Sequence, residues 1–490
     1  MFLNHTFYSH IMSKESSKKE EQGITVKKSE NISEWYTQVI QKAELLEYTD
    51  VSGCMIYRPR AYAIWEKIQQ FLDGEIKKLG VQNSYFPIFI PEKLLTKEKE
   101  HVEGFAPEVA WVTHGGNSKL NERLAVRPTS ETIMYDAYAK WIRSHRDLPL
   151  KLNQWNNVVR WEFKHPTPFL RGREFLWQEG HTAFAAKQEA DKEVLDILEL
   201  YRQVFEDYLA VPVILGKKTE EEKFAGADYS MSAETLTPSG KAVQACTSHH
   251  LGQRFAKSFD IEFLDEKGNK AYPYQNSWGI STRSIGAMII YHGDDKGLVL
   301  PPKVAPLQVV IVPILFDDSK KKVLEESAKL VKQFEKAGIS VKLDNREGYT
   351  AGWKFNEWEL KGVCIRIELG PKDLEKKQAI VVRRDNNKKE AVKLDDIVKF
   401  ASKELEQMQK DMFEKAKKWM SENTVHVGTV EKLIEAVNQH KMAVIEWDKA
   451  KNRIDEIKEK AAGKCLNLPF KEYFMIDKED KEYAIFAKSY

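Results

Sequence analysis

Cysteine is scarce in this sequence of 490 residues, which contains only Cys54, Cys246, Cys364 and Cys465. The four thiols are widely spaced, and none belongs to a CxxC pair. A disulfide framework needs a denser set of cysteines and an oxidising compartment. The scarcity therefore argues against a disulfide-rich secreted protein, and we expect the chain in the cytoplasm.

Long apolar runs and an excess of one charge are also missing. No stretch approaches the ~20 apolar residues that a membrane helix needs, so no membrane partner is expected. The 76 lysines and arginines nearly balance the 74 aspartates and glutamates, which leaves a formal charge of +2. A polyanionic partner must then be recognised by a local basic surface rather than by the field of the whole molecule.

The N-terminal part of the chain predicts one large domain. Residues 1–25 are mostly polar and are expected to form a mobile tail. Within residues 26–300, Pro59 and Gly80 bracket a predicted helix, and VQNSYFPIFI follows as a predicted strand. Many more strands and helices follow without regular alternation. This pattern predicts an α+β domain with a mainly antiparallel sheet flanked by helices.

The remaining chain predicts two smaller units. The proline-rich run LVLPPKVAP, residues 298–306, is typical of a linker. Residues 301–408 alternate between strands and helices, as a small α/β domain does. A long charged helix from about Asp395 to Asn423 leads into a C-terminal module, residues 409–490, whose runs KMAVIEW and EYAIFAKSY are expected to share a core. We expect the Tyr490 ring to pack on the large domain, with its carboxylate near a cation.

The stretch VVRWEFKHPTPFLRGREFLWQEGH, residues 158–181, predicts two strands and a connecting loop. Because side chains alternate along a strand, Arg160 and Glu162 share one face while Trp161 points toward the core. The same rule puts Trp177, Glu179 and His181 on one face of the second strand. Charged groups on a central sheet are costly to bury unless they are paired or meet a ligand, and arginine matches phosphate or carboxylate oxygens. The alternative is a solvated sheet face with salt bridges.

Three further stretches carry candidate residues. In RPTSET, Thr129 or Ser130 is predicted to cap a helix whose first turn contains Glu131. In QACTSHHLGQRF, Cys246, His249 and His250 suggest zinc ligands, but the motif lacks a second half. In GISTRSIG, a strand is expected to end at Ser281 and a helix to begin near Arg283, where backbone N–H groups and a guanidinium can hold an anion.

Together these stretches resemble a known family. GVQNSYFPIFIP, VVRWEF to FLWQEGH, and GISTRSIG are similar to the three motifs of class II aminoacyl-tRNA synthetases, and RPTSE, TSHH and GWKFNEWELKG are similar to strings of the prolyl-tRNA synthetases of archaeal and eukaryotic-like architecture. The resemblance covers nearly the whole chain after residue 25. It implies a class II catalytic domain at 26–300, an anticodon-binding domain at 301–408, and a homodimer formed at the strand that carries Pro87.

The resemblance also implies site residues. Arg160 and Arg283 would be catalytic, with Arg160 bridging the amino-acid carboxylate and the ATP α-phosphate. ATP would be bound by Arg160, Glu162, Arg171, Gly172, Gln244, Thr247, Ser281 and Arg283. The proline pocket would contain Thr129, Glu131, Arg160, Trp177, Glu179, His181 and His249. Gln244 would help to hold Mg²⁺ with the ATP, and Arg346, Lys354 and Arg366 would contact the tRNA anticodon.

The implied reaction is the activation of L-proline with ATP to prolyl-adenylate, followed by transfer to the 3′ end of tRNA(Pro). Attack of a carboxylate on the α-phosphate needs charge neutralisation and alignment more than a general base, which suits the many arginines. Near the anticodon residues, Trp353 and Trp358 are equally compatible with base stacking and with core packing.

Two alternatives remain open. A non-catalytic synthetase paralogue, acting as a binding or regulatory module, usually shows damage at the ATP arginines, whereas Arg160, Arg171 and Arg283 are all present. A metal-dependent synthetase for another amino acid would need a credible zinc triad. We expect ATP and Mg²⁺ as cofactors and no zinc.

The sequence departs from relatives of the implied family in two places. Only about a hundred residues separate Arg173 from Ser281, which leaves no room for the editing insertion of the bacterial-like type. The C-terminal module has Cys465 as its only cysteine, so the four-cysteine zinc site common in the family is not expected there.

Overall fold

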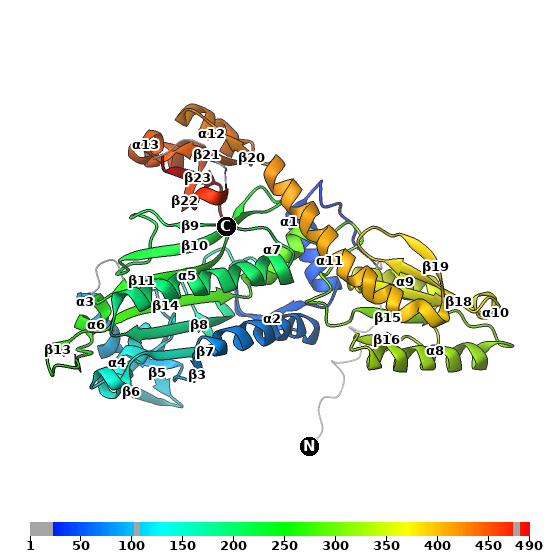
Figure 1. Cartoon of the computed structure of the whole chain (residues 1–490), viewed down its shortest axis with the longest axis horizontal. Coiled ribbons are helices and arrows are strands. Elements are labelled where there is room, and N and C mark those ends of the chain that lie inside the picture. Colours follow the sequence, from blue (N-terminus) through cyan, green and yellow to red (C-terminus); the bar gives the residue numbers. More distant parts are fainter. Residues whose placement is uncertain (1–22, 102–107, 474–480) are drawn as a thin grey trace, which may run out of the picture.

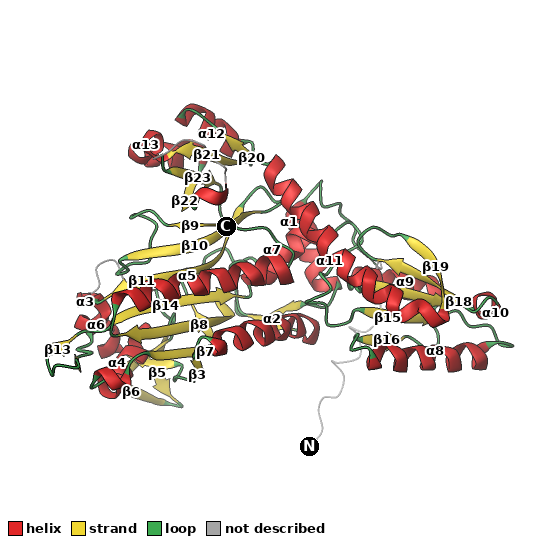
Figure 2. Ribbon diagram, viewed as in Figure 1, coloured by secondary structure: helices red, strands yellow, loops and turns green. Residues whose placement is uncertain are grey.

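The computed structural model describes residues 23–101, 108–473 and 481–490. Nearly all of the predicted N-terminal tail therefore lies outside the described residues. Figures 1 and 2 show a large body on the left, a smaller α/β domain on the right and a C-terminal module above. The long helix α11 (Ile397–Glu422) runs from the α/β domain to the C-terminal module, close to the predicted helix Asp395 to Asn423.

The main sheet has 11 strands in the order β20-β21-β23-β22-β9-β10-β11-β14-β8-β7-β3. Its neighbouring pairs from β22 to β7 are antiparallel, so the predicted antiparallel sheet is confirmed. The strands of the large domain in this sheet are β3 (Gln82–Asn83), β7 (Leu150–Val159), β8 (Glu174–Phe184), β9 (Ile214–Lys217), β10 (Tyr229–Leu236), β11 (Ala242–Gly252) and β14 (Tyr274–Ser281).

Helices flank this sheet, as the pattern predicts. The helices of the large domain are α1 (Ile32–Lys42), α2 (Pro59–Lys78), α3 (Glu92–His101), α4 (Glu131–Trp141), α5 (Lys187–Gln203), α6 (Arg254–Ser258) and α7 (Arg283–His292). Helix α2 has Pro59 at its first position and is followed by Gly80 with φ of +82°, which a side chain would strain. Together α1, α2, α5 and α7 bury a continuous apolar core against the sheet.

The prediction of one strand over VQNSYFPIFI is wrong. The segment instead contributes β3 to the main sheet and β4 (Phe89–Pro91) to a separate sheet of order β4-β6-β5. Pro87 lies between the two strands and has no backbone N–H for a sheet ladder. The other small strands of this domain are β1 (Leu46–Tyr48), β2 (Met55–Tyr57), β5 (Trp111–Gly115), β6 (Ser118–Val126), β12 (Phe263–Leu264) and β13 (Lys270–Ala271).

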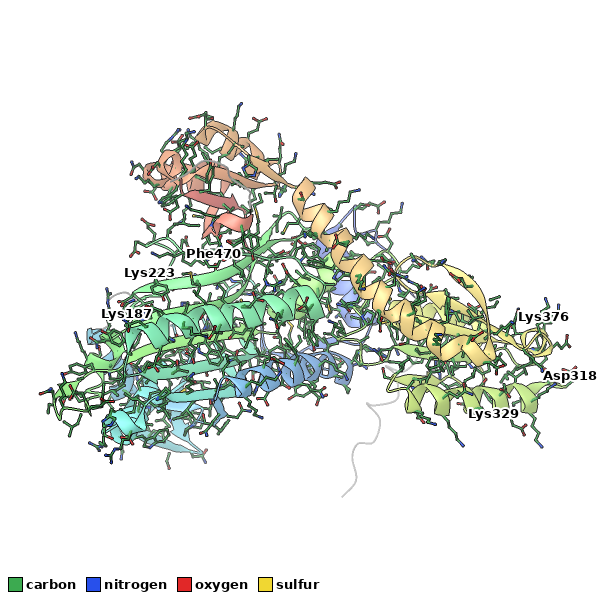
Figure 3. All side chains as sticks on the ribbon, viewed as in Figure 1. Lys187, Lys223, Asp318, Lys329, Lys376 and Phe470 are labelled. Carbon is green, nitrogen blue, oxygen red and sulfur yellow. The ribbon has the colours of Figure 1, made fainter. Side chains whose placement is uncertain are left out.

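The α/β domain has a five-stranded sheet in the order β16-β15-β17-β18-β19, with a parallel centre and an antiparallel edge. Its elements are β15 (Val309–Pro313), α8 (Lys320–Lys336), β16 (Val341–Leu343), α9 (Ala351–Leu360), β17 (Ile365–Leu369), α10 (Pro371–Glu375), β18 (Gln378–Arg383) and β19 (Lys389–Lys393). Its outer surface is highly charged, as Asp318, Lys329 and Lys376 illustrate in Figure 3.

The C-terminal module extends the main sheet. Its elements are β20 (Thr424–His426), α12 (Val430–Asn438), β21 (Met442–Glu446), α13 (Trp447–Ala450), α14 (Ile454–Ala461), β22 (Lys464–Pro469) and β23 (Tyr483–Ala487). The expected core is confirmed, because β21 and β23 pair and bury Ala443 against Phe486. Strand β22 also pairs with β9 of the large domain. The predicted boundary at residue 408 falls inside α11, so the chain passes between the two units as one continuous helix.

None of the described helices combines the length and the apolar character that a membrane span requires.

Candidate active site

A cavity of about 470 Å³ opens on the face of the main sheet formed by β8, β10, β11 and β14. Strands β7 and β8 form the predicted hairpin, in which Gln154 lies opposite Glu179. Trp177, Glu179 and His181 alternate along β8 and all line the cavity, as the strand periodicity predicts. Gly180, between them, faces the Trp278 ring of β14 so closely that an added Cβ would lie 2.2 Å from it.

Arg160 and Glu162 line the same cavity, but one part of the prediction is wrong. Strand β7 ends at Val159, and only the Arg160 N–H continues the ladder by donating to the Arg173 carbonyl. The chain then turns, and Trp161 is 37% exposed rather than in the core. Its ring lies under the Arg173 guanidinium, 4.7 Å away. The strand pattern could not locate the end of the strand, which the loop determines.

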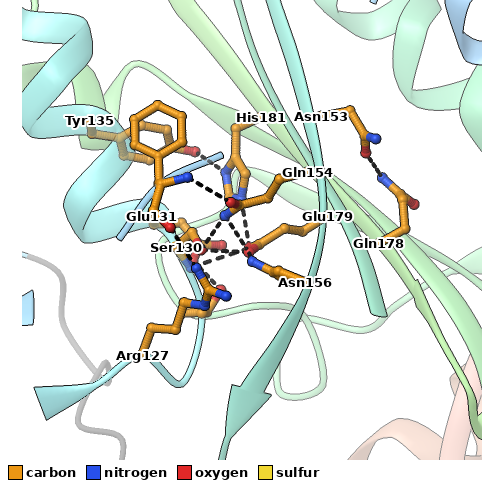
Figure 4. A network of polar contacts seen from close by, with 12 residues as sticks. Arg127, Ser130, Glu131, Tyr135, Asn153, Gln154, Asn156, Gln178, Glu179 and His181 are labelled. Atoms are coloured by element: carbon orange, nitrogen blue, oxygen red, sulfur yellow. Dashed lines mark hydrogen bonds and ion pairs between the residues drawn. The ribbon is translucent and has the colours of Figure 1, made fainter. Parts of the chain in front are cut away.

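Glu179 is the centre of a buried hydrogen-bond network (Figure 4). Gln154 Nε2 and Asn156 Nδ2 donate to its Oε1 at 2.9 and 2.8 Å, and the Ser130 hydroxyl donates to the same oxygen. The Ser130 N–H and His181 Nε2 reach its Oε2 at 3.2 and 3.0 Å. Burial alone would raise the pKa of Glu179, but the bonds from His181, Ser130 and Asn156 lower it below its ordinary value.

Helix α4 starts where the sequence predicts, but without a side-chain cap. Ser130 occupies the N-cap position, yet its hydroxyl bonds Glu179 instead of the helix. Thr129 donates its hydroxyl to Glu131 in the first turn. The residues that resemble a helix cap therefore build the floor of the cavity.

His181 is paired with Glu179 as an ion pair. Burial alone would lower the pKa of His181, but the Glu179 hydrogen bond and the charges of Glu131 and Glu179 raise it above its ordinary value. Among the described residues, Glu131, Glu179 and His181 also form a geometric triad with ligand atoms within 4.8 Å. Because Glu179 already accepts five hydrogen bonds and a raised pKa means that His181 binds a proton readily, these groups do not present a free metal-ligand set. The absence of zinc stays a prediction.

Arg160 and Arg283 line the other end of the cavity, and Arg171 lies in the cavity that adjoins it. Arg283 donates from Nε to the Leu170 carbonyl and from Nη1 to the Gln244 carbonyl, at 2.9 and 3.3 Å. Burial, together with the charges of Arg160 and Arg171, lowers the pKa of Arg283 to about 10. No ion pair among the described residues neutralises Arg160, Arg171 or Arg283, so this region is prepared for an anion.

A second cavity of about 380 Å³ adjoins the first, and both are lined by Lys218, Gln244 and Arg283. Arg171 lines only this second cavity. Lys218 Nζ, which is buried, donates to Glu234 Oε1 and to the Leu466 carbonyl of the C-terminal module, at 2.6 Å each. Sequence reasoning missed Lys218 and Glu234, because a single lysine and a single glutamate 16 positions apart give no pattern.

Tyr490 also lines the second cavity. Its hydroxyl donates to Ser239 Oγ at 2.8 Å, and its N–H donates to the Ala242 carbonyl at 3.2 Å. The expected docking on the large domain is therefore confirmed. The expected ion pair of the terminal carboxylate is not among the ion pairs of the described residues, and Lys241 Nζ lies over the ring instead, 4.9 Å from its centre.

His249 lies at the cavity wall, while His250 points to the opposite side of β11. His249 Nδ1 is 2.7 Å from Ser230 Oγ, and its ring packs on Phe224 with centroids 4.9 Å apart. Burial and the nearby Lys218 charge lower the pKa of His249 to about 3, so it is neutral. Because adjacent residues of a strand face opposite sides, His249 and His250 cannot bind one ion.

The first cavity therefore gathers most of the predicted site. It is lined by Thr129, Glu131, Arg160, Glu162, Trp177, Glu179, His181, Gln244, Thr247, His249, Ser281 and Arg283. Gly172 lies in the loop before β8, where an added Cβ would lie 2.9 Å from the Glu174 carbonyl. Trp177 Nε1 and Ser277 Oγ are buried without a hydrogen-bond partner among the described residues, so both remain available to a ligand.

The predicted anticodon residues have a different environment. Arg366 is buried and pairs with Glu368 and Glu359 at 2.8 and 3.0 Å. Lys354 is also buried and donates to the Asp344 carbonyl at 3.0 Å.

Arg346 has the most exposed side chain of the three predicted anticodon residues. It pairs with Asp344 and Glu357, and its guanidinium lies over the rings of Tyr349 and Trp353. Trp358 is buried, which favours core packing for this tryptophan.

Comparisons with known proteins agree with this geometry. The family described as "tRNA synthetase class II core domain (G, H, P, S and T)" matches residues 111–292, and "Anticodon binding domain" matches residues 308–404. The chain is 50% identical to "Proline--tRNA ligase, cytoplasmic" of Arabidopsis thaliana, over 96% of this chain and 91% of that protein. It is 48% identical to "Proline--tRNA ligase" of Natranaerobius thermophilus, over 94% and 97%.

A solved structure is equally similar. The crystal structure of prolyl-tRNA synthetase from Cryptosporidium parvum, complexed with halofuginone and AMPPNP, superposes with a TM-score of 0.90. It is 50% identical in sequence and is matched over 96% of this chain and 100% of that chain. On this similarity in sequence, fold and cavity, the chain belongs to the proline--tRNA ligase family of class II aminoacyl-tRNA synthetases.

Proposed function

We propose that this chain activates L-proline with ATP and transfers it to the 3′ end of tRNA(Pro). The observation that carries the proposal is the pair of adjoining cavities in which a buried carboxylate network at one end meets three arginines without acidic partners at the other. A carboxylate oxygen of proline would attack the α-phosphorus, and pyrophosphate would leave. The terminal adenosine hydroxyl would then attack the activated carbonyl, and AMP would leave.

The carboxylate end suits proline. Because Glu179 and His181 neutralise one another, Glu131 is left as the anion that would meet the charged secondary amine. The Trp177 ring and the neighbouring Phe175 would provide an apolar wall for the pyrrolidine ring. Arg160, whose Nε donates to the Pro128 carbonyl at 3.1 Å, would meet the substrate carboxylate.

The arginine end suits the triphosphate. Arg283 and Arg171 would contact the β- and γ-phosphates, Glu162 the adenine, and Thr247 and Ser281 the nucleotide. Gln244 lies opposite Glu234 in the β10–β11 register, so two oxygen-bearing side chains face the same region, as Mg²⁺ prefers. Bound Mg²⁺ would neutralise part of the phosphate charge. The AMPPNP complex of the solved relative supports nucleotide binding by this chain.

The α/β domain would bind the anticodon. Tyr349 and Trp353 pack with centroids 4.1 Å apart, and Tyr349 is 47% exposed. This aromatic pair, capped by Arg346, is the surface best suited to base stacking. Lys354 and Arg366 would act beneath it by holding the domain together. The domain limits 26–300, 301–408 and 409–490 are part of the proposal.

The proposal also includes the assembly and the location of the chain. A homodimer is proposed on the exposed apolar residues around the first motif, among which Tyr85 is 71% exposed and Phe89 45%. A cytoplasmic location is proposed from the scarce cysteines and from the relative named cytoplasmic.

The test is ATP–pyrophosphate exchange with a panel of amino acids. Proline-dependent exchange is expected, together with charging of tRNA(Pro), without added zinc and without stoichiometric zinc in the purified protein. No exchange with any amino acid, despite retained nucleotide binding, would favour the non-catalytic paralogue. Exchange with another amino acid, lost on chelation and restored by zinc but not by Mg²⁺, would favour the metal-dependent synthetase.

A further inference from the structure

Helix α7 connects the phosphate end of the cavity with the α/β domain. Arg283 is its first residue, and the helix ends at His292, so at about 1.5 Å per residue its ends are roughly 15 Å apart. All residues from Ser284 to Tyr291 are buried. A buried helix of this length moves as a rigid unit, so its C-terminal end helps to set the position of Arg283.

The C-terminal end of α7 is seated by the N-terminal segment of the chain. Lys28 Nζ donates to the Gly293 carbonyl at 2.8 Å, and Trp35 Nε1 donates to the Asp294 carbonyl at 2.9 Å. Gly293 leaves no room for a side chain, because an added Cβ would lie 2.8 Å from the Trp35 ring. These contacts satisfy carbonyl groups at the end of the helix.

The α/β domain reaches the same point through Arg384, next to the ion pair of Lys296 with Glu359 at 3.4 Å. Arg384 Nη2 and Nη1 donate to Asp294 Oδ1 and Oδ2 at 2.6 and 2.7 Å, a two-pronged ion pair. Arg384 is buried, and its Nε donates to the Glu359 carbonyl at the end of α9, at 2.8 Å. Its N–H donates to the Cys364 carbonyl. The guanidinium is therefore held by its own domain while it pairs with Asp294, two residues after the end of α7.

We propose that Arg384 and Asp294 are positioning residues for the adenylation step: the α/β domain holds α7 through this pair and so keeps Arg283 aligned with the ATP phosphates. The proposal rests on the proposed role of Arg283. It gives the α/β domain a part in the reaction that does not depend on tRNA. Helix α9 contains Trp353, which packs on Tyr349, and its Glu359 carbonyl accepts from Arg384, so the same helix joins the aromatic pair to Arg384.

A matched control is available at the same end of α9. Lys361 Nζ contacts Glu44 Oε2 at 3.1 Å, which also joins the α/β domain to the large domain but does not involve α7. A loss of nucleotide affinity that arose only from looser docking of the two domains would be equally large in Lys361→Met. A loss through α7 would be confined to variants of Asp294 and Arg384.

The experiment measures binding of a non-hydrolysable ATP analogue by calorimetry, and KM for ATP and for proline in exchange, in the full chain. Asp294→Asn and Arg384→Met are each expected to weaken nucleotide binding ~5-fold or more, with KM for proline within ~2-fold of wild type. Lys361→Met should leave nucleotide binding within ~2-fold. The double variant should be no weaker than the weaker single variant, because both changes break one pair.

Nucleotide affinity within ~2-fold of wild type in folded Asp294→Asn would overturn the proposal. An equal loss in Lys361→Met would overturn it too. If Arg384→Met does not fold, Arg384→Lys keeps the charge but not the two-pronged geometry and is expected to show an intermediate loss. Nucleotide binding needs no proline, so failure of proline-dependent exchange in the wild type would contradict the proposed function and leave this test intact. Arg283→Ala serves as the reference for complete loss of the contact.

Discussion

The catalytic cavity and the α/β domain use arginine in opposite ways. Arg160, Arg171 and Arg283 converge on one region with no acidic partner among the described residues, and burial together with their mutual repulsion lowers the pKa of Arg283. Arg346 and Arg366 each pair with two carboxylates. An arginine that lacks a partner where burial is costly is prepared for a ligand, whereas a fully paired one holds the protein together. Sequence alone does not separate these two uses.

The largest effect is expected where an unpartnered arginine is removed. Arg160→Ala and Arg283→Ala should each lower kcat/KM for proline-dependent exchange by at least ~100-fold, since each removes a charged contact to developing phosphate charge. The thermal midpoint should stay within about 3 °C of wild type, because no ion pair is broken. Near wild-type exchange in a folded variant would show that the arginine in question does not contact the phosphates.

Removing a paired arginine should instead reduce stability. Arg366→Ala removes the buried partner of Glu359 and Glu368, which keep only the longer contacts of Lys296 and Lys389, and the free energy of unfolding of the α/β domain should fall by about 2 kcal/mol. Denaturant unfolding followed by tryptophan fluorescence would measure it. A variant of unchanged stability that loses only tRNA charging would mean that Arg366 contacts RNA after all.

An intermediate effect is expected at the C-terminus. A chain ending at Ala487 loses Tyr490, which bonds Ser239 and lines the second cavity beside Arg171 and Gln244. The rate of ATP–pyrophosphate exchange should fall ~10-fold, whereas the thermal midpoint of the large domain should change little. Kinetics and thermal melts of the same preparation would decide, and unchanged exchange would show that the docked terminus does not support the site.

The smallest effect concerns pH. The pKa of His181 is raised above 6.5, so its contribution to stability is complete below that pH and fades as pH rises through the raised pKa. The lowered pKa of Glu179 makes its contribution complete above about 4.5 and lost at more acidic pH. His181→Gln should therefore cost about 1 kcal/mol more at pH ~5.5 than at pH ~9.

The control for this pH effect is His292→Gln. Burial lowers the pKa of His292 to about 4, below its value in the unfolded chain, so only the unfolded chain binds a proton there at pH ~5.5, and His292→Gln should cost less at pH ~5.5 than at pH ~9, the opposite sign to His181→Gln. Equal pH dependence of the two variants would contradict a charged His181.

Much of the site followed from local patterns. The alternation along β8 correctly grouped Trp177, Glu179 and His181, and the strand-to-helix change placed Ser281 and Arg283. Local patterns failed where distant segments decide. Trp161 lies in the loop against Arg173 rather than in the core. Lys218 is held by Glu234 and by the Leu466 carbonyl, which is 248 positions away in the sequence. The ion pairs of the predicted anticodon residues could not be predicted for the same reason, since charge alone does not reveal a buried partner.

The contrast between unpartnered and paired arginines is tested most directly by calorimetric binding of a non-hydrolysable ATP analogue to Arg283→Ala and to Arg346→Ala, without proline or tRNA. We expect affinity to fall ~30-fold or more in Arg283→Ala and to stay within ~2-fold of wild type in Arg346→Ala. Equal affinities in the two variants, with both folded, would contradict the assignment of the arginine cluster as the phosphate site.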